Sequence, residues 1–339
     1  MAEIDIFNIA PSVVTRDLSS KSFLLYGARK SGKTSNAVKF PKPLLIACER
    51  GYNMLSGVIA QPVNKWTEML KIKKQLLKDA QSVDTGEKNE TAFKSVIVDT
   101  ADIAYVYCEQ YILQLEGVDH LDETTQMRGY KEVKREFDSF FQDIVKAGYT
   151  LIAISHSTTI QIKENGEKYD RIIPSIERRG FEVLAGLVDV IGYSTSEIND
   201  EGQAHPVLYM RGSKSLEAGS RNKYMSEKIA FTYDALLGDM TQAIDKLAAN
   251  GAEVVDNPIN AFKDQSDEVD FDKTVEDIKQ IALACRDANI TEQYQDVVTS
   301  HLGKNKNVRD CTRDQADILG LVLLDLRDMC KANKIAVSK

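Results

Sequence analysis

The sequence predicts an α/β protein with a mostly parallel sheet, antiparallel strands at one edge of that sheet, and a small helical C-terminal domain. Three features of the chain support this fold class. Short apolar runs alternate with longer amphipathic stretches from about residue 21 to 248, as in parallel strands joined by helices. After residue 187 the apolar runs follow one another directly, which is typical of antiparallel strands. Beyond residue 272 the apolar residues have helical spacing.

Four apolar runs are expected to be buried strands, because each is continuous and is bounded by polar or turn residues. They are SFLLY (22–26), PLLIACE (43–49), FKSVIVDT (93–100) and YTLIAISH (149–156). Two stretches between them, 64–80 and 130–148, have helical spacing and are expected to cover the sheet. In the second stretch one apolar face is formed by Val133, Phe137, Phe140, Phe141 and Ile144, and Gly148 is expected to end the helix.

The remaining segments complete the expected domain organisation. Residues 187–198, 204–212 and 228–233 are expected to be strands, with NDEGQ (199–203) as a hairpin turn. Residues 249–272 are polar and acidic and contain Gly and Pro, so they are interpreted as a linker. The organisation is therefore an N-terminal extension (1–20), a core (21–248), the linker (249–272) and a helical C-terminal domain (273–336).

Composition and charge exclude several classes of protein. Hydrophobic residues make up 43% of the chain and charged residues 28%, as in ordinary soluble proteins, and no run is long enough to span a membrane. The N-terminus lacks the basic segment of a signal peptide, and five scattered cysteines without a CxxC pair favour a reducing compartment. The net charge of −8 argues against a generally basic nucleic-acid surface. DNA contacts would have to come from local loops or from a channel shared in an oligomer.

GARKSGKT (27–34) follows the first strand and fits the phosphate-loop pattern G-x-x-x-x-G-K-[ST]. Glycines let the backbone form a nest of N–H groups for phosphate oxygens, and the helix that starts at Lys33 adds its dipole. We expect Lys33 to reach the β- and γ-phosphates of ATP and the Thr34 hydroxyl to hold Mg²⁺. The expected nucleotide-binding residues are Gly27, Ala28, Arg29, Lys30, Ser31, Gly32, Lys33, Thr34 and Ser35.

Three further polar residues follow apolar strands. KSVIVDT ends in Asp99, which is expected to bind Mg²⁺ as a Walker B aspartate. Glu49 follows the strand PLLIA and could accept a proton from an attacking water, although a solvated strand-end glutamate is the alternative. His156 follows YTLIAIS and could hydrogen-bond the γ-phosphate, although a purely structural histidine is equally compatible with the pattern.

With these motifs in this order, the chain resembles the RecA-like branch of P-loop ATPases. It is most similar to the compact phage-type members, including the RecA-like single-strand annealing proteins of phage recombination systems. FPKPLLIACERG (40–51) is similar to the segment of that group whose glutamate activates water, and VIVDT (96–100) corresponds to its Walker B strand. IAISH (152–156) occupies the place of the strand whose terminal Gln or His senses the γ-phosphate. The resemblance implies a RecA-like core, ATP and Mg²⁺ as cofactors, and the cytoplasm of a bacterial host.

The segment GSRNKYM (219–225) resembles the K-N-R-[FY] segment of RecA-like DNA-repair ATPases. In that group the basic residues reach across a subunit interface to the nucleotide of the neighbour. The resemblance therefore implies a homo-oligomer, a ring or a filament, in which Arg221 or Lys223 acts in trans. The order of Lys and Arg is swapped here, which leaves open which residue does so, and a surface charge pair is the alternative.

In RecA-like proteins the loops after the Walker B region and after the sensor strand face the DNA. They correspond here to residues 116–130 and 157–180. A β-hairpin of mixed charge is the alternative for the second segment, and KNKNVRDCTR (304–313) is a second basic cluster that is either a phosphate patch or a solvated loop. The candidate DNA-binding residues are Lys163, Lys168, Tyr169, Arg171, Arg178 and Arg179.

The function expected from these features is ATP hydrolysis, stimulated by single-stranded DNA, in phage recombination, repair or replication. One alternative is a nucleotide-gated adaptor or loader whose C-terminal helices bind a single-strand-binding or replication protein. A P-loop kinase is the other, with ERRG (177–180) as part of its lid. A water-activating Glu49 would be counterproductive in a kinase.

Overall fold

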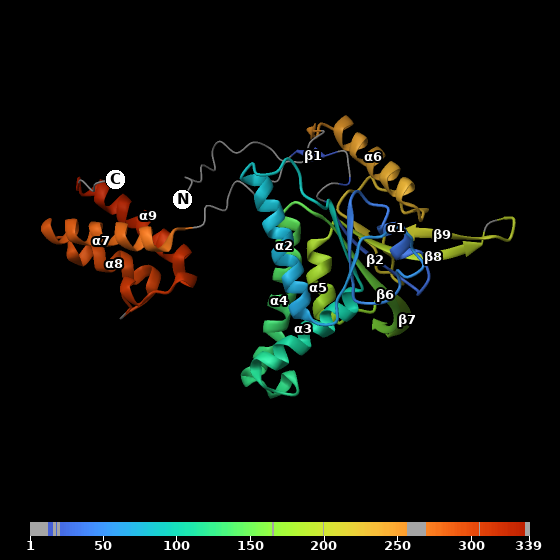
Figure 1. The fold of residues 1–339 in the computed structure, drawn as a ribbon, viewed down its shortest axis with the longest axis horizontal. Helices are drawn as coiled ribbons and strands as arrows, with labels where there is room; N and C mark the ends of the chain where they lie inside the picture. The colour runs from blue at the N-terminus through green and yellow to red at the C-terminus, as the bar shows by residue number, and fades with distance from the viewer. Residues whose placement is uncertain are drawn as a thin grey trace. The chain divides into compact units, whose positions relative to one another are not determined.

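The computed structural model describes residues 13–15, 18, 21–164, 166–198, 200–255, 269–304 and 306–335. These residues fall into two compact units, with residues 13–255 in the larger and residues 269–335 in the smaller (Figure 1). Each unit is described by itself. Most of the expected N-terminal extension and residues 256–268 of the expected linker lie outside the described residues.

Ten of the described strands of the larger unit form a mixed sheet with the path β11-β9-β8-β2-β6-β5-β3-β4, and β1 and β12 form a separate pair. Strands β8, β2, β6, β5, β3 and β4 are parallel to one another, and β9 and β11 add antiparallel strands at one edge. The prediction of a mostly parallel sheet with antiparallel edge strands is confirmed. The strands on this path are β2 (Ser22–Gly27), β3 (Pro43–Ala47), β4 (Ala60–Pro62), β5 (Ser95–Asp99), β6 (Thr150–Glu164), β8 (Val190–Ile198), β9 (Ala204–Tyr209) and β11 (Lys228–Ala230). Off the path, β7 (Glu167–Pro174) pairs with β6 and β10 (Gly219–Ser220) pairs with β8.

Helices cover both faces of this sheet, because alternate residues of each parallel strand enter two separate apolar cores. Leu24 belongs to the core on one face, whereas Phe23 and Leu25 belong to the core on the other. The first core includes residues of α2 (Trp66–Asp84), α3 (Ala101–Glu116), α4 (Arg128–Lys146) and α5 (Arg178–Leu187), and the second includes residues of α1 (Lys33–Ala37) and α6 (Tyr233–Ala249). Figure 1 shows the two helical layers on either side of the strands.

The helices on the first face were only partly predictable. The five residues expected on the apolar face of α4 are all fully buried, and Gly148 has a left-handed φ of 88° just beyond the helix end. Helix α3 was not predicted. Its buried stripe is obscured in the sequence because Val106 and Leu115, on its other sides, are exposed although they are apolar.

Segments expected to lie outside the core contribute to the larger unit. Strand β1 (Val14–Thr15) pairs in parallel with β12 (Val254–Val255), and Leu18 is buried in the second core. The linker expected from residue 249 therefore begins with residues that belong to the larger unit. Two strands of two residues each are too short to produce a periodic pattern of apolar residues, so the sequence does not predict them.

The smaller unit consists, in its described part, of helices α7 (Phe271–Asp287), α8 (Thr291–Leu302) and α9 (Ala316–Ala332) with short turns η4 (Val308–Asp310) and η5 (Arg313–Gln315). Their apolar faces meet in one core that includes Ile281, Val298 and Leu326. In the basic cluster of residues 304–313, Arg313 is paired with Asp272 at 2.6 Å. Among the described residues of the whole chain, no helix has both the length and the hydropathy needed to cross a bilayer.

Candidate nucleotide site

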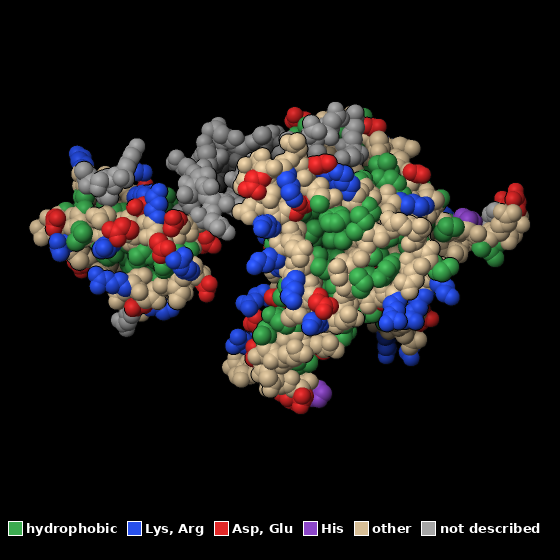
Figure 2. Space-filling model, viewed as in Figure 1, with side chains coloured by type: hydrophobic (Ala, Val, Ile, Leu, Met, Phe, Trp, Pro, Cys, Tyr) green, Lys and Arg blue, Asp and Glu red, His purple; other side chains and the backbone are tan. Residues whose placement is uncertain are grey.

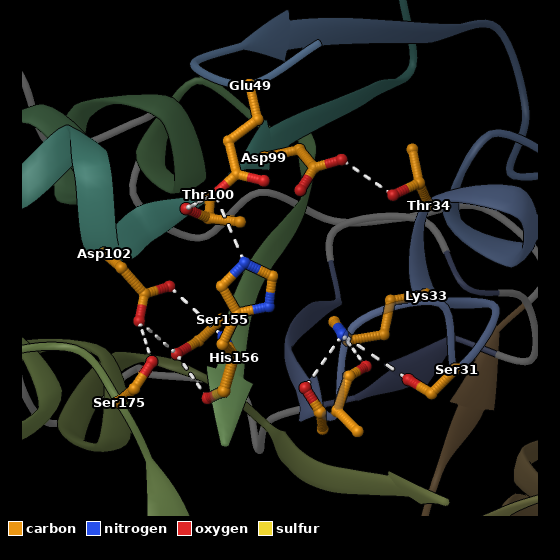
Figure 3. A network of polar contacts seen from close by, with 12 residues as sticks. Ser31, Lys33, Thr34, Glu49, Asp99, Thr100, Asp102, Ser155, His156 and Ser175 are labelled. Atoms are coloured by element: carbon orange, nitrogen blue, oxygen red, sulfur yellow. Dashed lines mark hydrogen bonds and ion pairs between the residues drawn. The ribbon is translucent and has the colours of Figure 1, made fainter. Parts of the chain in front are cut away.

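The carboxyl ends of four parallel strands converge at one edge of the sheet, and the side chains predicted to bind ATP lie there (Figure 3). The strand register explains this convergence. Gly27 at the end of β2 is aligned with His156 in β6, and Asp99 at the end of β5 is aligned with Ala47 at the end of β3. Glu49 follows Ala47 by two residues, and its backbone N–H donates to the carbonyl of Asp99 at 3.2 Å. Ligand sites of open α/β sheets lie at this position.

The phosphate loop runs from the end of β2 to α1, which begins at Lys33 as expected. Gly27 must be a glycine because a Cβ atom there would lie 2.2 Å from the carbonyl oxygen of Ser194 in β8. Gly32, which precedes α1, has a left-handed φ of 84° that glycine adopts at no steric cost. The side chains between the two glycines include Ala28, Arg29 and Lys30, which are exposed. The loop therefore offers its backbone, and little side-chain bulk, to a ligand.

Lys33 is the buried charged residue of the phosphate loop, whereas Arg29 and Lys30 are exposed. Its side chain is 5% exposed, and its Nζ donates to the carbonyls of Gly27 at 2.9 Å and Ala28 at 2.8 Å. Ser31 accepts a longer bond from Nζ at 3.4 Å. Burial lowers the pKa of Lys33, an effect that the nearby carboxylates, of which Asp99 is the strongest, partly oppose. The ammonium group is thus held by the loop that it is expected to bridge to phosphate.

Thr34 and Asp99 form the expected metal-binding pair. Thr34 Oγ1 donates to Asp99 Oδ2 at 2.7 Å, and Asp99 is 7% exposed. Burial raises the pKa of Asp99, whereas the bond from Thr34 lowers it. In the described residues no group of three or more His, Cys, Asp or Glu forms a metal site of its own. The Thr34–Asp99 pair fits the kind of Mg²⁺ site that forms only with bound nucleotide. In such a site one carboxylate and one hydroxyl bind the ion together with phosphate and water oxygens.

Glu49 and His156 contact each other beside this pair. His156 Nε2 lies 3.2 Å from Glu49 Oε1, and Thr100 Oγ1 donates to the same oxygen at 3.4 Å. The other imidazole nitrogen, Nδ1 of His156, is buried and has no hydrogen-bond partner among the described residues. The two residues expected to act on water and on the γ-phosphate are therefore coupled directly. Neighbouring Cys48 is no nucleophile, because burial raises the pKa of its thiol to about 12.

Four residues that the sequence did not single out complete the site. Ser194 Oγ lies 2.6 Å from Ser31 Oγ in the phosphate loop, and Asn36 of α1 donates to the carbonyl of Phe231. Asp102, on the first turn of α3, accepts hydrogen bonds from Ser155 and from Ser175. Serine, asparagine and first-turn aspartate are common in loops and at helix starts, so no sequence signal distinguishes them.

The structure places Arg221 away from this site. Its guanidinium donates to the carbonyl of Gly186 at 2.6 Å and lies 3.5 Å from Asp189. Asp189 in turn accepts from the backbone N–H of Ser22, which begins β2, so Arg221 lies at the opposite end of that strand from Gly27. Lys223 lies over the ring of Tyr224 and lines a pocket of about 500 Å³ together with Arg211. Lys223 and Arg221 also line a pocket with Lys21 and Asp189, so both lie at the amino end of β2 and away from the phosphate loop.

The segment expected to be a DNA-facing loop is instead a β-hairpin. Strand β6 continues from His156 to Glu164, and β7 returns from Glu167 and pairs with it in antiparallel fashion. Hydrogen bonds between the two paired strands stabilise this segment, and its secondary structure is the β-hairpin given as the alternative. The other expected loop, 116–130, forms the short turns η1 (Leu121–Glu123) and η2 (Thr125–Met127) and the start of α4.

The six candidate DNA-binding residues divide into two groups. Lys163, Lys168, Tyr169 and Arg171 lie on the hairpin, where Lys163 and Lys168 face each other directly across the strands. The three arginines are engaged in pairs. Arg171 bonds Glu217 at 2.7 Å, Arg178 bonds Glu182 at 3.2 Å, and Arg179 bonds Glu177 and lies 4.3 Å from the ring centre of Tyr130. Because Arg178 and Arg179 begin helix α5, they are not part of the hairpin.

The chain is similar to several known proteins. The chain is 27% identical over 331 residues to YorG, an SPbeta prophage-derived uncharacterized protein of Bacillus subtilis strain 168, with 96% of this chain and 98% of that protein aligned. The solved structure of the KaiC-like protein PH0186 from Pyrococcus horikoshii aligns with 60% of this chain and 83% of that protein. The two are 9% identical over this alignment, with a TM-score of 0.32. A family model described as an AAA domain matches residues 19–222, which is more than half of the chain and includes the whole phosphate loop, Glu49, Asp99 and His156. The chain therefore belongs to the AAA domain family and carries a P-loop ATPase domain.

Proposed function

We propose that this protein hydrolyses ATP as an oligomer that acts on single-stranded DNA, in phage recombination, repair or replication. The observation that carries the proposal is the continuity of strand β6. It runs without a break from His156, beside Glu49 and Asp99, into a hairpin that carries Lys163 and Lys168. The nucleotide site and the lysine pair of the hairpin are therefore joined by one strand.

The charge arrangement of the hairpin supports an anionic partner. Like charges directly opposite each other on a sheet are destabilising, so an anion bound beside Lys163 and Lys168 would relieve their repulsion. Lys214, from the turn that follows β9, lies 4.6 Å from the ring centre of Tyr169 and pairs with Glu167 at 3.5 Å. Figure 2 shows Lys and Arg side chains around the place that Figure 1 labels β7. Cations beside an aromatic ring are the pattern of single-strand binding grooves.

The oligomer and the phage setting rest on separate support. Arg221 and Lys223 lie at the end of β2 opposite the phosphate loop, so the roles implied by the resemblance would require a neighbouring subunit. A ring or filament would also repeat the hairpin along one strand, and its phosphate contacts would add up despite a net charge of −8. The prophage origin of YorG supports a phage source, and with it a bacterial cytoplasm.

The test is ATP hydrolysis with and without a single-stranded oligonucleotide, at about 50 mM and about 200 mM salt. We expect DNA to stimulate hydrolysis at the lower salt and to lose much of this effect at the higher. In the double variant Lys163→Ala/Lys168→Ala, the stimulation should be lost while hydrolysis without DNA is kept. The matched control is Lys71→Ala/Lys74→Ala, which removes two exposed lysines of helix α2 that have no assigned role. Equal stimulation in the hairpin variant and the wild type would refute the assignment.

The adaptor is the second candidate, and one observation favours it. Helix α9 exposes three leucine or isoleucine side chains at a spacing of three, Ile318, Leu321 and Leu324, at 39%, 49% and 49%. A single-strand-binding or replication protein could bind such a face through a hydrophobic groove or helix. Two results together would favour the adaptor: a rate of ATP hydrolysis that DNA does not change, and loss of partner binding in the variant Leu321→Asp/Leu324→Asp.

A further inference from the structure

Asp102 accepts hydrogen bonds from three groups, two in strand β6 and one just after strand β7. Its Oδ1 accepts from Ser155 Oγ at 3.0 Å and from Ser175 Oγ, and its Oδ2 accepts from the backbone N–H of His156 at 3.3 Å (Figure 3). Ser155 and His156 belong to β6, and Ser175 directly follows β7. The carboxylate therefore lies at the base of the hairpin, three residues after Asp99.

These contacts close a ring of hydrogen bonds. The N–H of His156 donates to Asp102, the N–H of Ser175 donates to the carbonyl of His156 at 2.8 Å, and the hydroxyl of Ser175 donates back to Asp102. Strand β5 ends at Asp99, which is aligned with Ile154, so β6 has no β5 residue beside His156. Asp102 supplies the acceptor that the missing strand would have offered. Both backbone groups of His156 are consequently fixed by Asp102 and Ser175.

A carboxylate in the first turn of a helix is common, since it complements the helix dipole. That general effect does not require three donors from residues more than fifty positions away in the sequence. It also does not require the carboxylate to face the sensor histidine. The ring thus needs an explanation that involves His156 and the hairpin.

We propose that Asp102 is a positioning residue that couples the nucleotide site to the hairpin. Asp102 is fixed to Asp99 through the start of α3, while the imidazole of His156 contacts Glu49. A rearrangement of Glu49 and His156 around the γ-phosphate moves the backbone of His156, and the ring transmits this movement to Ser175 and the end of β7. The part of this inference that concerns DNA rests on the proposed function, whereas the coupling to nucleotide does not.

The experiment measures hydrogen exchange of the full-length protein over residues 157–174, with and without Mg²⁺ and the slowly hydrolysed analogue ATPγS. In the wild type we expect bound nucleotide to change the exchange of the hairpin. Asp102→Ala should lose that change while the analogue still binds, because the hydrogen bonds found for Asp102 in the described residues lead to β6 and Ser175, and it acts on Lys33 only through its charge. Asp102→Asn should restore the change, because an amide supplies an acceptor for His156 and a donor for the serine hydroxyls.

Two further variants keep the result interpretable. Ser175→Ala removes one side of the ring at an exposed residue, so it tests the coupling even if Asp102→Ala fails to fold. Asp119→Ala changes an exposed carboxylate just beyond the far end of α3 and should behave as the wild type. The inference is overturned if nucleotide leaves the wild-type hairpin unchanged, or if the ring variants keep the full change. If Asp102→Asn also loses the nucleotide-dependent change in hydrogen exchange, the hydrogen-bond ring is not what transmits the movement to the hairpin.

The DNA assay separates this inference from the proposed function. If nucleotide changes the hairpin but DNA does not stimulate hydrolysis in the wild type, the proposed function fails and the coupling stands. The opposite result is also possible: DNA stimulates hydrolysis equally in the wild type and Ser175→Ala, and nucleotide leaves the hydrogen exchange of the hairpin unchanged in both. In that case the coupling fails and the proposed function stands.

Discussion

The hydroxyl of Thr34 donates a 2.7 Å hydrogen bond to Oδ2 of Asp99, which joins the phosphate loop after β2 to the end of β5. Strand β6 lies between β2 and β5, so two strands that are not neighbours contribute to one metal-binding pair. The bond fixes the two oxygen ligands before a metal binds. Several expected results follow from this arrangement and from the residues around it.

Replacing Thr34 by Val should remove one oxygen ligand of Mg²⁺ and keep the shape of the side chain. We expect the Mg²⁺ concentration for half-maximal hydrolysis to rise by about tenfold or more, as for other changes at metal sites. Titration of the ATPase rate with MgCl₂ measures this. Ser35→Ala, at the exposed neighbouring hydroxyl, is the control, and equal Mg²⁺ dependence in both variants would contradict the assignment.

Asp99→Asn should stabilise the protein without nucleotide while it abolishes hydrolysis. Burial raises the pKa of Asp99, so its charged form costs folding stability as the pH rises above the ordinary aspartate value of about 3.9. The amide keeps an acceptor for Thr34 and carries no charge. We expect its advantage in melting temperature over the wild type to be smallest close to about pH 4 and to grow as the pH is raised from there toward neutral. A variant that is less stable across this range would disprove the electrostatic argument.

Lys33→Ala should lower the rate of ATP hydrolysis by at least about a hundredfold, because it removes the preorganised cation aimed at the phosphates. Steady-state phosphate release measures this effect. Lys30→Ala, three residues earlier at an exposed position of the same loop, should have a much smaller effect. The comparison separates the buried ammonium from the general charge of the loop.

Glu49→Gln should lower the rate of hydrolysis by about 10²–10⁴-fold and keep ATP binding, if Glu49 accepts the proton of the attacking water. Binding is measured with a fluorescent ATP analogue and hydrolysis by phosphate release. His156→Gln tests the partner at 3.2 Å, since an amide can still donate to Glu49. Normal turnover in Glu49→Gln would leave Glu49 as a solvated strand-end residue.

Arg221 and Lys223 should differ in subunit-mixing experiments. Arg221 is held by Asp189 and Gly186, so Arg221→Ala should mainly lower the melting temperature. Lys223→Ala should abolish hydrolysis in the oligomer, and mixing it with Lys33→Ala subunits should restore activity, because each variant supplies what the other lacks. A mixture that stays inactive would remove Lys223 as the residue that acts in trans.

The sequence by itself determined the features that depend on local pattern. Apolar runs of five or six residues predict β2, β3 and β5, and the spacing of Phe137, Phe140 and Phe141 predicts the buried face of α4. The phosphate loop and Asp99 are recognisable because their chemistry requires fixed residue types next to a strand. Fold class and the nucleotide site were therefore predictable.

Only the tertiary structure decided which distant residues meet. The order of strands in the sheet brings Thr34 to Asp99 and Glu49 to His156, and no local pattern encodes that order. Strand length also belongs to this level, since β6 extends past the sheet only because β7 pairs with it. Asp102 and Ser175 are ordinary residues in the sequence. They become part of the site because hydrogen bonds at the end of β5 must be satisfied by whatever the fold brings there.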